Sequence, residues 1–328
     1  MRPRVVITHW VHPEVVALLR RGGLRVVANP TRESWPCRTL LKHAAQAAAL
    51  MAFMPDRIDD AFLAACPNLK AIGAALKGFD NIDVAACTRR GVRVTIVPDL
   101  LTEPAAELTL GMMIALARHV FAGDRRVRRT PYKGWRPVLY GRGLAGETVG
   151  ILGMGAIGQA IAQRLSGFEV TLLCHDAMRL EPARLSELGA EQVSFKRVLA
   201  RSTYVIVALP LNAATVHAVD VAALKRMKKG AFLINIGRGS VVDEEAVARA
   251  LVSGHLRGYA ADVFEFEDLS RPERPRSIPK PLLAAPNTLF LPHLGSAVED
   301  VRREIALSAA RSILAVFRGK PPSTCVNP

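Results

Sequence analysis

Long hydrophobic runs are missing from this 328-residue sequence. The longest apolar stretch, residues 108–117, is interrupted by Thr109 and Gly111. It is about half as long as the roughly 20 residues that a membrane-spanning helix needs. Near the N-terminus, the apolar run over residues 5–7 is too short for the core of a secretory signal peptide. We therefore expect a soluble, cytoplasmic protein with no membrane partner.

Cysteine is also scarce, and its spacing follows no pattern. The sequence has five cysteines, an odd number, and no two of them form a C-x-x-C pair. This excludes the disulfide-rich secreted class and gives no zinc-ribbon spacing. We expect reduced thiols and no metal site; the cysteines are at positions 37, 66, 87, 174 and 325.

Acidic residues are few relative to basic ones. The chain has 44 Lys and Arg residues against 29 Asp and Glu residues, for a formal net charge of +15. The densest basic stretch, residues 118–142, contains no recognised nucleic-acid-binding motif. We interpret it as a solvated helix face and loop rather than a DNA or RNA site. A net positive field favours small anions instead.

What the sequence does contain is a regular alternation of β-rich and helical segments. Aromatic residues make up only 5% of the chain while Ala, Val and Leu are common, which is typical of parallel sheets covered by helices. In the first hundred residues the pattern predicts strands at 4–8, 24–28, 50–53, 70–74 and 92–97 and helices at 13–21, 59–65 and 84–90.

A second series follows one long helical pattern over residues 103–129. It predicts strands at 148–152, 169–174, 204–209, 231–236, 258–263 and 288–291, and a closing helix at 298–318. The pattern indicates an α/β protein of two doubly wound parallel-sheet domains, one inserted into the other. The boundaries predicted are 1–100 with 294–328 for the first domain and 101–293 for the inserted domain.

The inserted domain opens with a glycine motif. Gly153-Met154-Gly155-Ala156-Ile157-Gly158 follows a predicted strand and begins a helix, as in Rossmann dinucleotide-binding folds. The first glycine permits a tight turn, the second lets a pyrophosphate approach the backbone, and the third allows close helix–strand packing. Asp176 ends the next strand, where an acid binds the ribose hydroxyls and repels a 2′-phosphate. We predict NAD as the cofactor, in preference to NADP.

Three further motifs follow predicted strands of the inserted domain. They contain Arg238, Glu267 and His293, within Ile236-Gly237-Arg238-Gly239, Ala261-Asp262-Val263-Phe264-Glu265-Phe266-Glu267 and Pro292-His293-Leu294-Gly295-Ser296. Ligands of open parallel sheets bind outside the carboxyl ends of the strands, where these motifs lie.

Together with the glycine motif, these residues resemble the D-2-hydroxyacid dehydrogenase family over essentially the whole chain. The resemblance implies a Rossmann NAD-binding domain inserted into a flavodoxin-like substrate domain. It also implies that Arg238 binds the anionic group of the substrate, that His293 exchanges a proton, and that Glu267 holds His293.

One residue in the first domain departs from the family pattern and indicates a particular subgroup of the family. In Ala75-Leu76-Lys77-Gly78-Phe79-Asp80-Asn81-Ile82-Asp83, Lys77 stands where the family usually has a small uncharged residue. This segment, and residues 51–57, 97–102 and 134–137, are similar to the members of the family that oxidise phosphite. The resemblance implies NAD-dependent oxidation of phosphite to phosphate, with Lys77 and Arg238 binding the dianion and His293 acting as base on a water.

The remaining site residues come from the same resemblance. It places in the substrate pocket Met54, Leu76, Gly78, Leu101, Trp135, Tyr140 and Ser296. It places around the cofactor the glycines 153, 155 and 158 with Ala156, Ile157, Asp176, Ala208, Leu209, Pro210, Ile236, Gly237, Arg238 and Asp262. A homodimer is implied as well, with some pocket residues contributed by the second subunit.

Two alternatives use the same residues. The first is a 2-hydroxyacid dehydrogenase of the glyoxylate, hydroxypyruvate or D-lactate type, against which Lys77 speaks. The second is a non-catalytic, dinucleotide-sensing corepressor or scaffold on the same fold, which can keep Arg238, Glu267 and His293.

Overall fold

The computed structural model describes residues 2–129, 131–320 and 322–327 and divides into two compact units. Unit 1 comprises the chain up to Leu101, the short segment Leu269–Pro272, and the chain from Ala297 onward. Unit 2 comprises Thr102–Asp268 and Glu273–Ser296. Each unit is built around its own parallel sheet.

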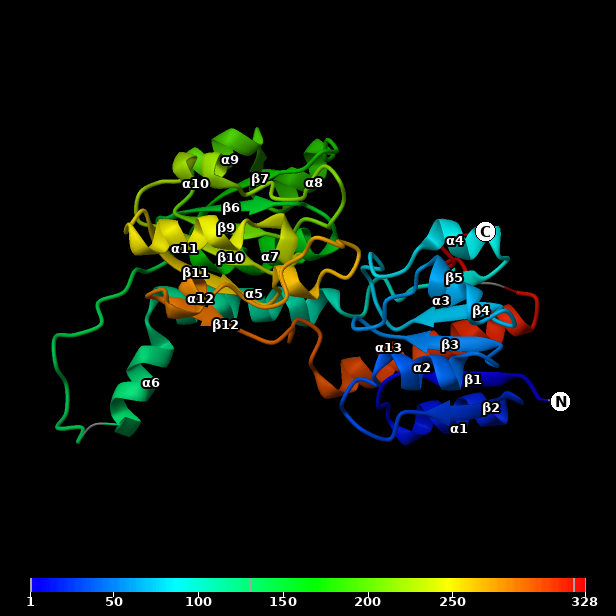
Figure 1. Cartoon of the computed structure of the whole chain (residues 1–328). Coiled ribbons are helices and arrows are strands. Elements are labelled where there is room, and N and C mark those ends of the chain that lie inside the picture. Colours follow the sequence, from blue (N-terminus) through cyan, green and yellow to red (C-terminus); the bar gives the residue numbers. More distant parts are fainter. Residues whose placement is uncertain (1, 130, 321, 328) are drawn as a thin grey trace. The chain divides into compact units, whose positions relative to one another are not determined.

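Unit 1 contains a five-stranded parallel sheet with helices on both faces (Figure 1). Its strand order is β2-β1-β3-β4-β5, the flavodoxin-like order. The strands are β1 (Arg4–Ile7), β2 (Arg25–Ala28), β3 (Ala49–Ala52), β4 (Ala71–Ala74) and β5 (Arg93–Thr95). In β3 and β4 every residue is buried because both faces of the sheet are covered, which explains the unbroken apolar runs.

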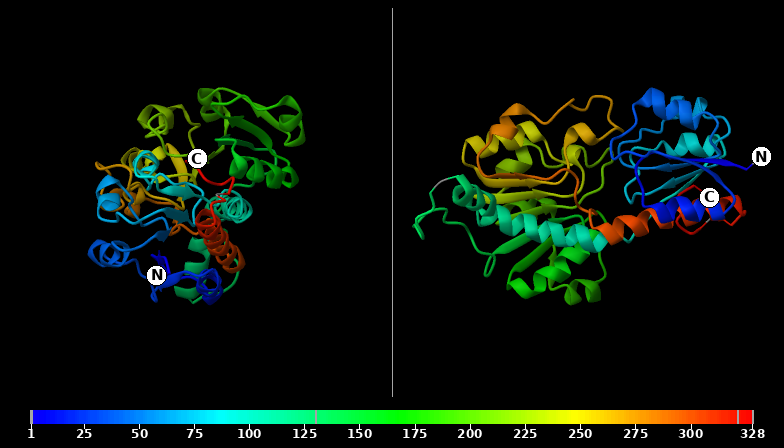
Figure 2. Two further views of the ribbon diagram at one scale, coloured as in Figure 1. Left: turned by 90° about the vertical axis from the view of Figure 1, so that its right-hand side faces the viewer. Right: turned by 90° about the horizontal axis from the view of Figure 1, so that it is seen from below.

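The helices of unit 1 divide between the two faces of its sheet. One apolar cluster packs α1 (Pro13–Arg21) and α13 (Glu299–Phe317) against the strands, and Figure 2 shows these two helices side by side. The opposite cluster contains side chains from α2 (Cys37–Ala44), α3 (Asp60–Ala64) and α4 (Val84–Arg89). The last long helix thus completes the domain that the first hundred residues begin.

Unit 2 contains a seven-stranded parallel sheet in the order β12-β11-β10-β9-β6-β7-β8. Numbered from the first strand of the unit, this is the Rossmann order with one strand added at the β12 edge. The strands are β6 (Thr148–Leu152), β7 (Thr171–His175), β8 (Ala190–Gln192), β9 (Tyr204–Val207), β10 (Ala231–Asn235), β11 (Leu256–Ala261) and β12 (Thr288–Phe290). The predicted fold class is confirmed.

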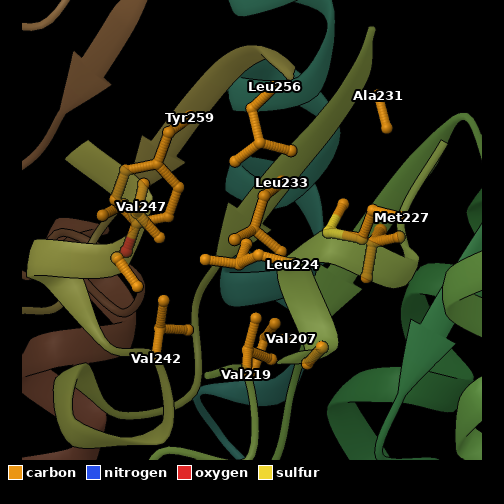
Figure 3. Packing of buried hydrophobic residues seen from close by; sticks show 14 of the residues in the cluster. Val207, Val219, Leu224, Met227, Ala231, Leu233, Val242, Val247, Leu256 and Tyr259 are labelled. Atoms are coloured by element: carbon orange, nitrogen blue, oxygen red, sulfur yellow. The ribbon is translucent and has the colours of Figure 1, made fainter. Parts of the chain in front are cut away.

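Helices cover both faces of this second sheet as well. One face packs against α5 (Thr102–Ala117) and α7 (Ala156–Leu165). The other packs against α9 (Phe195–Arg201), α10 (Val221–Arg226), α11 (Glu244–Val252) and α12 (Lys280–Ala284). Figure 3 shows this second core, with the ring of Tyr259 beside Val247 of α11. The remaining elements are α8 (Pro182–Glu187) and the short 3₁₀ turns η1 (Ser166–Phe168), η2 (Gly239–Val241) and η3 (Glu265–Glu267).

The single long helix predicted over residues 103–129 is wrong. The chain forms α5 and then α6 (Val120–Arg129), with His119 between them at a φ of 54°. A non-glycine residue in the left-handed region ends a helix. The two helices are bent by 61°, and α6 stands away from the sheet of its unit (Figure 1) with no buried residue among those described.

The length and apolar composition of each helix decide whether it could cross a membrane. In the described residues, no single helix is long and apolar enough to cross a bilayer, and only the bent pair α5 and α6 meets the length and composition together.

The packing of α13 on the first sheet depends on Gly73 of β4. A Cβ atom built at Gly73 would lie 2.7 Å from Ile313 Cγ1 and 2.9 Å from the backbone oxygen of Ala309. We predict that Gly73→Ala lowers the free energy of unfolding by roughly 1–3 kcal/mol, as overpacked cores do. Gly111→Ala in α5 is the matched control, because a Cβ there meets nothing within 4 Å. In the control, helix propensity should raise stability by about 0.5–1 kcal/mol. Denaturant unfolding measures both, and equal effects of the two substitutions would contradict the prediction.

Candidate functional site at the carboxyl ends of the second sheet

The glycine motif forms a tight loop between β6 and α7. Gly153 has a φ of 98°, which favours glycine. A Cβ at Gly158 would lie 2.0 Å from the backbone oxygen of Gly153, so a side chain at that position would force the loop away from the helix. Both glycines are therefore required by the backbone itself.

The middle glycine differs, because the space beside it is open. A Cβ at Gly155 meets no atom within 4 Å, and both Gly155 and Ala156 are exposed. Gly155 caps α7 without a side-chain hydrogen bond, so its own side chain does not satisfy the first N–H groups of the helix. Such a helix N-terminus binds phosphate groups. The loop fits a dinucleotide pyrophosphate.

Asp176 is brought beside this loop by the parallel pairing of β6 and β7. Its carboxylate accepts hydrogen bonds from the backbone N–H of Met154 (2.7 Å) and of Met178 (2.9 Å). An acceptor group at the end of the second strand, next to the phosphate loop, is placed to receive ribose hydroxyls. The described residues therefore fit the adenosine half of NAD.

The ends of β9 and β10 lie next to the glycine loop. A Cβ at Gly153 would lie 2.7 Å from the backbone oxygen of Ala208, and one at Gly237 would lie 2.5 Å from that of Leu209. Ala208, Leu209, Ile236 and Gly237 thus form adjoining segments of backbone. This close packing leaves no room for a side chain at position 237. Pro210 follows at an exposed position.

Arg238 is held at the end of β10 by a residue that the motif analysis missed. The buried side chain of Asn235 donates to the backbone oxygen of Arg238 (3.0 Å) and accepts from the N–H of Gly237 (3.2 Å). The half-buried Arg238 guanidinium also donates to the oxygen of Gly237 (3.1 Å). The sequence carried no local signal for this role, because the burial of Asn235 is known only from the structure.

Glu267 and His293 are joined by a hydrogen bond. His293 Nδ1 lies 2.8 Å from Glu267 Oε2, and both side chains are partly exposed. Glu267 Oε1 accepts the N–H of Phe264 (3.0 Å), which fixes the carboxylate. A carboxylate at Nδ1 fixes the tautomer and the orientation of the ring, with Nε2 on the opposite side of the imidazole.

Asp262 supports the loop that carries His293. Its buried carboxylate accepts the N–H groups of Leu294 (2.6 Å) and Gly295 (2.8 Å). Burial raises the pKa of Asp262, while the hydrogen bond from Leu294 and the charge of His293 act in the opposite direction. His293 itself has a φ of 57°, a conformation that persists only where its surroundings enforce it. The side chain of Asp262 thus fixes the backbone of the loop that carries His293.

The residues expected in the substrate pocket are divided between the two units. In unit 1, Lys77 is half-buried; burial lowers its pKa and the charge of Asp99 raises it. Leu76 is buried beside it, and Met54, Gly78 and Leu101 are partly buried. In unit 2, Ser296 is partly buried, whereas Trp135 and Tyr140 are 79% and 71% exposed on the segment after α6.

Sequence reasoning also missed a buried network at the carboxyl ends of β1 and β3. Asp56 Oδ2 accepts the hydroxyl of Thr8 (2.5 Å) and the N–H of Phe53 (2.7 Å), and burial raises the pKa of Asp56 to about 6. The side chain of Asn81 donates a hydrogen bond to the backbone oxygen of Asp56 (2.7 Å). These bonds fix residues 53–56 at the point where the strand order reverses, which is the usual ligand crevice of such sheets.

Comparison with known proteins agrees with this geometry. Residues 110–295 match the family described as D-isomer specific 2-hydroxyacid dehydrogenase, NAD binding domain. The chain is 37% identical to a glyoxylate reductase of Pyrococcus horikoshii, over 100% of this chain and 96% of that protein. It is 38% identical to a glyoxylate reductase of Aeropyrum pernix, over 99% of this chain and 96% of that protein.

Among solved structures, the TT0316 protein of Thermus thermophilus superposes with a TM-score of 0.89 at 35% identity, covering 98% of this chain and 99% of that one. The match therefore extends beyond the NAD-binding domain to the whole chain, and the chain belongs to the D-isomer specific 2-hydroxyacid dehydrogenase family.

Proposed function

We propose that this protein is an NAD-dependent oxidoreductase that interconverts a small 2-oxo acid of the glyoxylate type and its 2-hydroxy acid. The observation that carries the proposal is the 2.8 Å contact between Glu267 and His293, at the same sheet edge as the glycine loop and Arg238. The names of the relatives support a glyoxylate-type substrate over the phosphite that Lys77 led us to expect.

The residues of the site account for the polar steps of this reaction. A bound nicotinamide would supply the hydride in reduction and accept it in oxidation. The Arg238 guanidinium binds the carboxylate of the acid through charge-assisted hydrogen bonds. In reduction, His293 gives a proton to the carbonyl oxygen, and in oxidation it takes the proton of the hydroxyl group. Glu267 holds the ring so that Nε2 faces this exchange.

The acid Asp176 supports NAD rather than NADP as the cofactor. A carboxylate at the end of β7 would bind the ribose hydroxyls and repel a 2′-phosphate, because like charges repel each other. Membership of the family does not determine which cofactor is preferred, because a related reductase of Sinorhizobium meliloti was solved in complex with NADP. The preference therefore rests on this chain's own residue.

The role of His293 leads to a mutational prediction. We expect His293→Ala to lower kcat by at least the roughly hundredfold typical of a lost general acid–base group. The dissociation constant of NADH should stay nearly unchanged. Glu267→Gln should have a milder effect, because the carboxylate orients the ring without reacting. Steady-state kinetics with NADH-fluorescence titration separates the two. Near-normal turnover of His293→Ala would remove this residue from the mechanism.

Phosphite oxidation remains a second candidate because one observation favours it. Lys77 is half-buried between Leu76 and Gly78, and burial lowers its pKa, so the environment of this lysine is not that of an ordinary surface side chain. Phosphite is a compact dianion with no apolar part, and a second fixed cation besides Arg238 favours such a ligand. A carboxylate substrate needs only one such cation.

The two substrates are distinguished by one spectrophotometric assay. The purified chain is given NADH with glyoxylate or hydroxypyruvate, and NAD with phosphite, D-glycerate or D-lactate, each repeated with the 2′-phosphorylated cofactor. We expect turnover of glyoxylate, with the unphosphorylated cofactor preferred. If phosphite is the substrate, Lys77→Ala should weaken its binding by roughly 2–4 kcal/mol, seen as a raised KM. Lys77→Arg should recover part of the loss, and NADH affinity should not change. Turnover of phosphite alone would overturn the glyoxylate assignment, and turnover of none would overturn both.

We further propose that the chain forms a homodimer through α6. The exposed apolar side chains Val120, Phe121 and Val127 lie on this one helix at 48%, 47% and 53% exposure. Apolar groups gathered on a helix that stands away from its own sheet favour burial against another protein surface. Trp135 and Tyr140 lie on the segment that continues from α6.

Charge substitutions in α6 test the dimer. Phe121→Asp should convert a dimer into monomers at micromolar concentration, since an unpaired carboxylate would be buried in the interface. Val252→Asp, at the 72% exposed end of α11, is the matched control and should leave the mass unchanged. Sedimentation velocity gives the masses. A monomeric unsubstituted chain, or a Phe121→Asp variant that stays dimeric, contradicts this interface.

A further inference from the structure

A buried carboxyl group that the reaction does not use lies beneath the loop that carries Glu267. Glu244, the first residue of α11, is fully buried, and Glu265 of η3 is 7% exposed. The two exchange hydrogen bonds: the N–H of Glu265 donates to Glu244 Oε1 (2.8 Å), and the N–H of Glu244 donates to Glu265 Oε1 (3.1 Å). This reciprocal contact joins the start of α11 to the turn that ends at Glu267.

A second set of contacts joins the same turn to the Arg238 loop. Asp268 Oδ2 accepts the N–H of Ser240 (2.6 Å), and the N–H of His217 donates to the oxygen of Ser240 (2.7 Å). His217 Nε2 lies 2.8 Å from Glu265 Oε2. A Cβ at Gly239 would lie 1.9 Å from the carbonyl carbon of Phe264. The segments that present Arg238 and Glu267 are thus in direct backbone contact and share one buried polar network.

Capping of α11 does not explain why Glu244 is buried. Asp243 is the N-cap and accepts the N–H of Ala246 (2.9 Å). Ordinary helix N-terminal acids remain exposed and ionised, where the helix dipole favours their charge; Glu245, the next residue, is exposed. Glu244 is instead directed into the interior, against η3.

We infer that Glu244 is a positioning residue that, through its reciprocal hydrogen bonds with Glu265, holds the turn presenting Glu267 to His293. The inference rests on the proposed function, since it concerns the geometry of the acid–base pair. In the uncharged state the Glu244 carboxyl accepts the N–H of Glu265 without adding a charge to the cluster. In the ionised state it would stand as a buried anion beside other carboxylates and push this turn away.

The surroundings of Glu244 favour the uncharged state. The titratable groups facing it are Glu265, Glu267 and Asp268 from the η3 segment and Tyr259 from β11, with His217 paired to Glu265. Its Oε2 is buried and has no hydrogen-bond partner among the described residues. Burial, the largest cause, and the charges of the nearby carboxylates raise the pKa of Glu244 to about 8, while the hydrogen bond from the N–H of Glu265 acts in the opposite direction. Because this pKa lies above that of an unfolded glutamate, the associated stability is complete at low pH and is lost as the pH rises through about 8.

Glu244→Gln is the decisive variant because an amide keeps the shape of the protonated carboxyl and cannot ionise. The reaction is followed in the oxidative direction, with NAD and D-glycerate or phosphite, in which His293 accepts a proton from the substrate. One pH unit above a pKa about nine-tenths of a group is ionised. We expect kcat of the unsubstituted enzyme to fall about tenfold from pH 7.5 to pH 9. Glu244→Gln should lose less than twofold.

The matched control is Glu245→Gln, the same chemical change at the neighbouring exposed position. It should reproduce the unsubstituted profile, with the loss above pH 8. His217→Gln should lower kcat at every pH with an unchanged dissociation constant for NADH, because it removes the 2.8 Å support of Glu265. If Glu244→Gln keeps the alkaline loss, or if Glu245→Gln abolishes it, the positioning role is wrong.

An activity-independent readout separates this inference from the proposed function. In ¹⁵N-histidine-labelled protein, the low-field Nδ1–H signal reports the hydrogen bond from His293 to Glu267. It should weaken above pH 8 in the unsubstituted chain and persist in Glu244→Gln. A chain inactive with every acid tested would refute the proposed function, and this signal would still decide the role of Glu244. A signal with the same pH dependence in both proteins refutes that role.

Discussion

The hydrogen bond between Glu267 and His293 depends on the loops that follow adjacent parallel strands. Glu267 lies after β11, and His293 lies after β12, the strand paired to β11. The imidazole and the carboxylate meet at 2.8 Å only because Asp262 binds the backbone of the His293 loop and the N–H of Phe264 binds the Glu267 carboxylate. The left-handed φ of His293 stores strain that these bonds offset.

Close backbone packing is the second constraint on the site. Gly237 and Gly239 flank Arg238, and in each case a Cβ atom would collide with the backbone of a neighbouring loop. Loops that touch through their main chains cannot shift independently. We therefore expect the Arg238 guanidinium and the Glu267 carboxylate to move together. Charged groups that are already oriented before the reaction need no reorganisation during it.

The chemistry of the site is concentrated in short motifs, and this is why much of it could be predicted. The glycine loop, Asp176, Arg238, Glu267 and His293 each follow a strand whose apolar pattern is visible in the sequence. The fold class and every strand except β8 followed from the same patterns, whereas the family followed from the resemblance of the motifs. The break between α5 and α6 did not, because neither Gly nor Pro marks it: the left-handed residue is His119. The short strand β8 and the helices α9 to α12 lacked a pattern strong enough to identify.

Residues whose importance lies in tertiary contacts could not be found in this way. Asn235, Asp56, His217 and Glu244 are ordinary polar residues within their own segments, and each acquires its role from the contacts that the folded chain brings to it. Glu244 and Glu265 are separated by a helix and a strand, yet they share two hydrogen bonds. The amino-acid sequence by itself determined the two parallel-sheet domains, the dinucleotide loop and the chemical identity of the candidate acid–base and anion-binding groups, because these depend on local periodicity and residue type. Only the tertiary structure decided which carboxyl groups are exposed and which are buried, and so raised the pKa of Asp56, Asp262 and Glu244, because desolvation arises only when distant segments pack together.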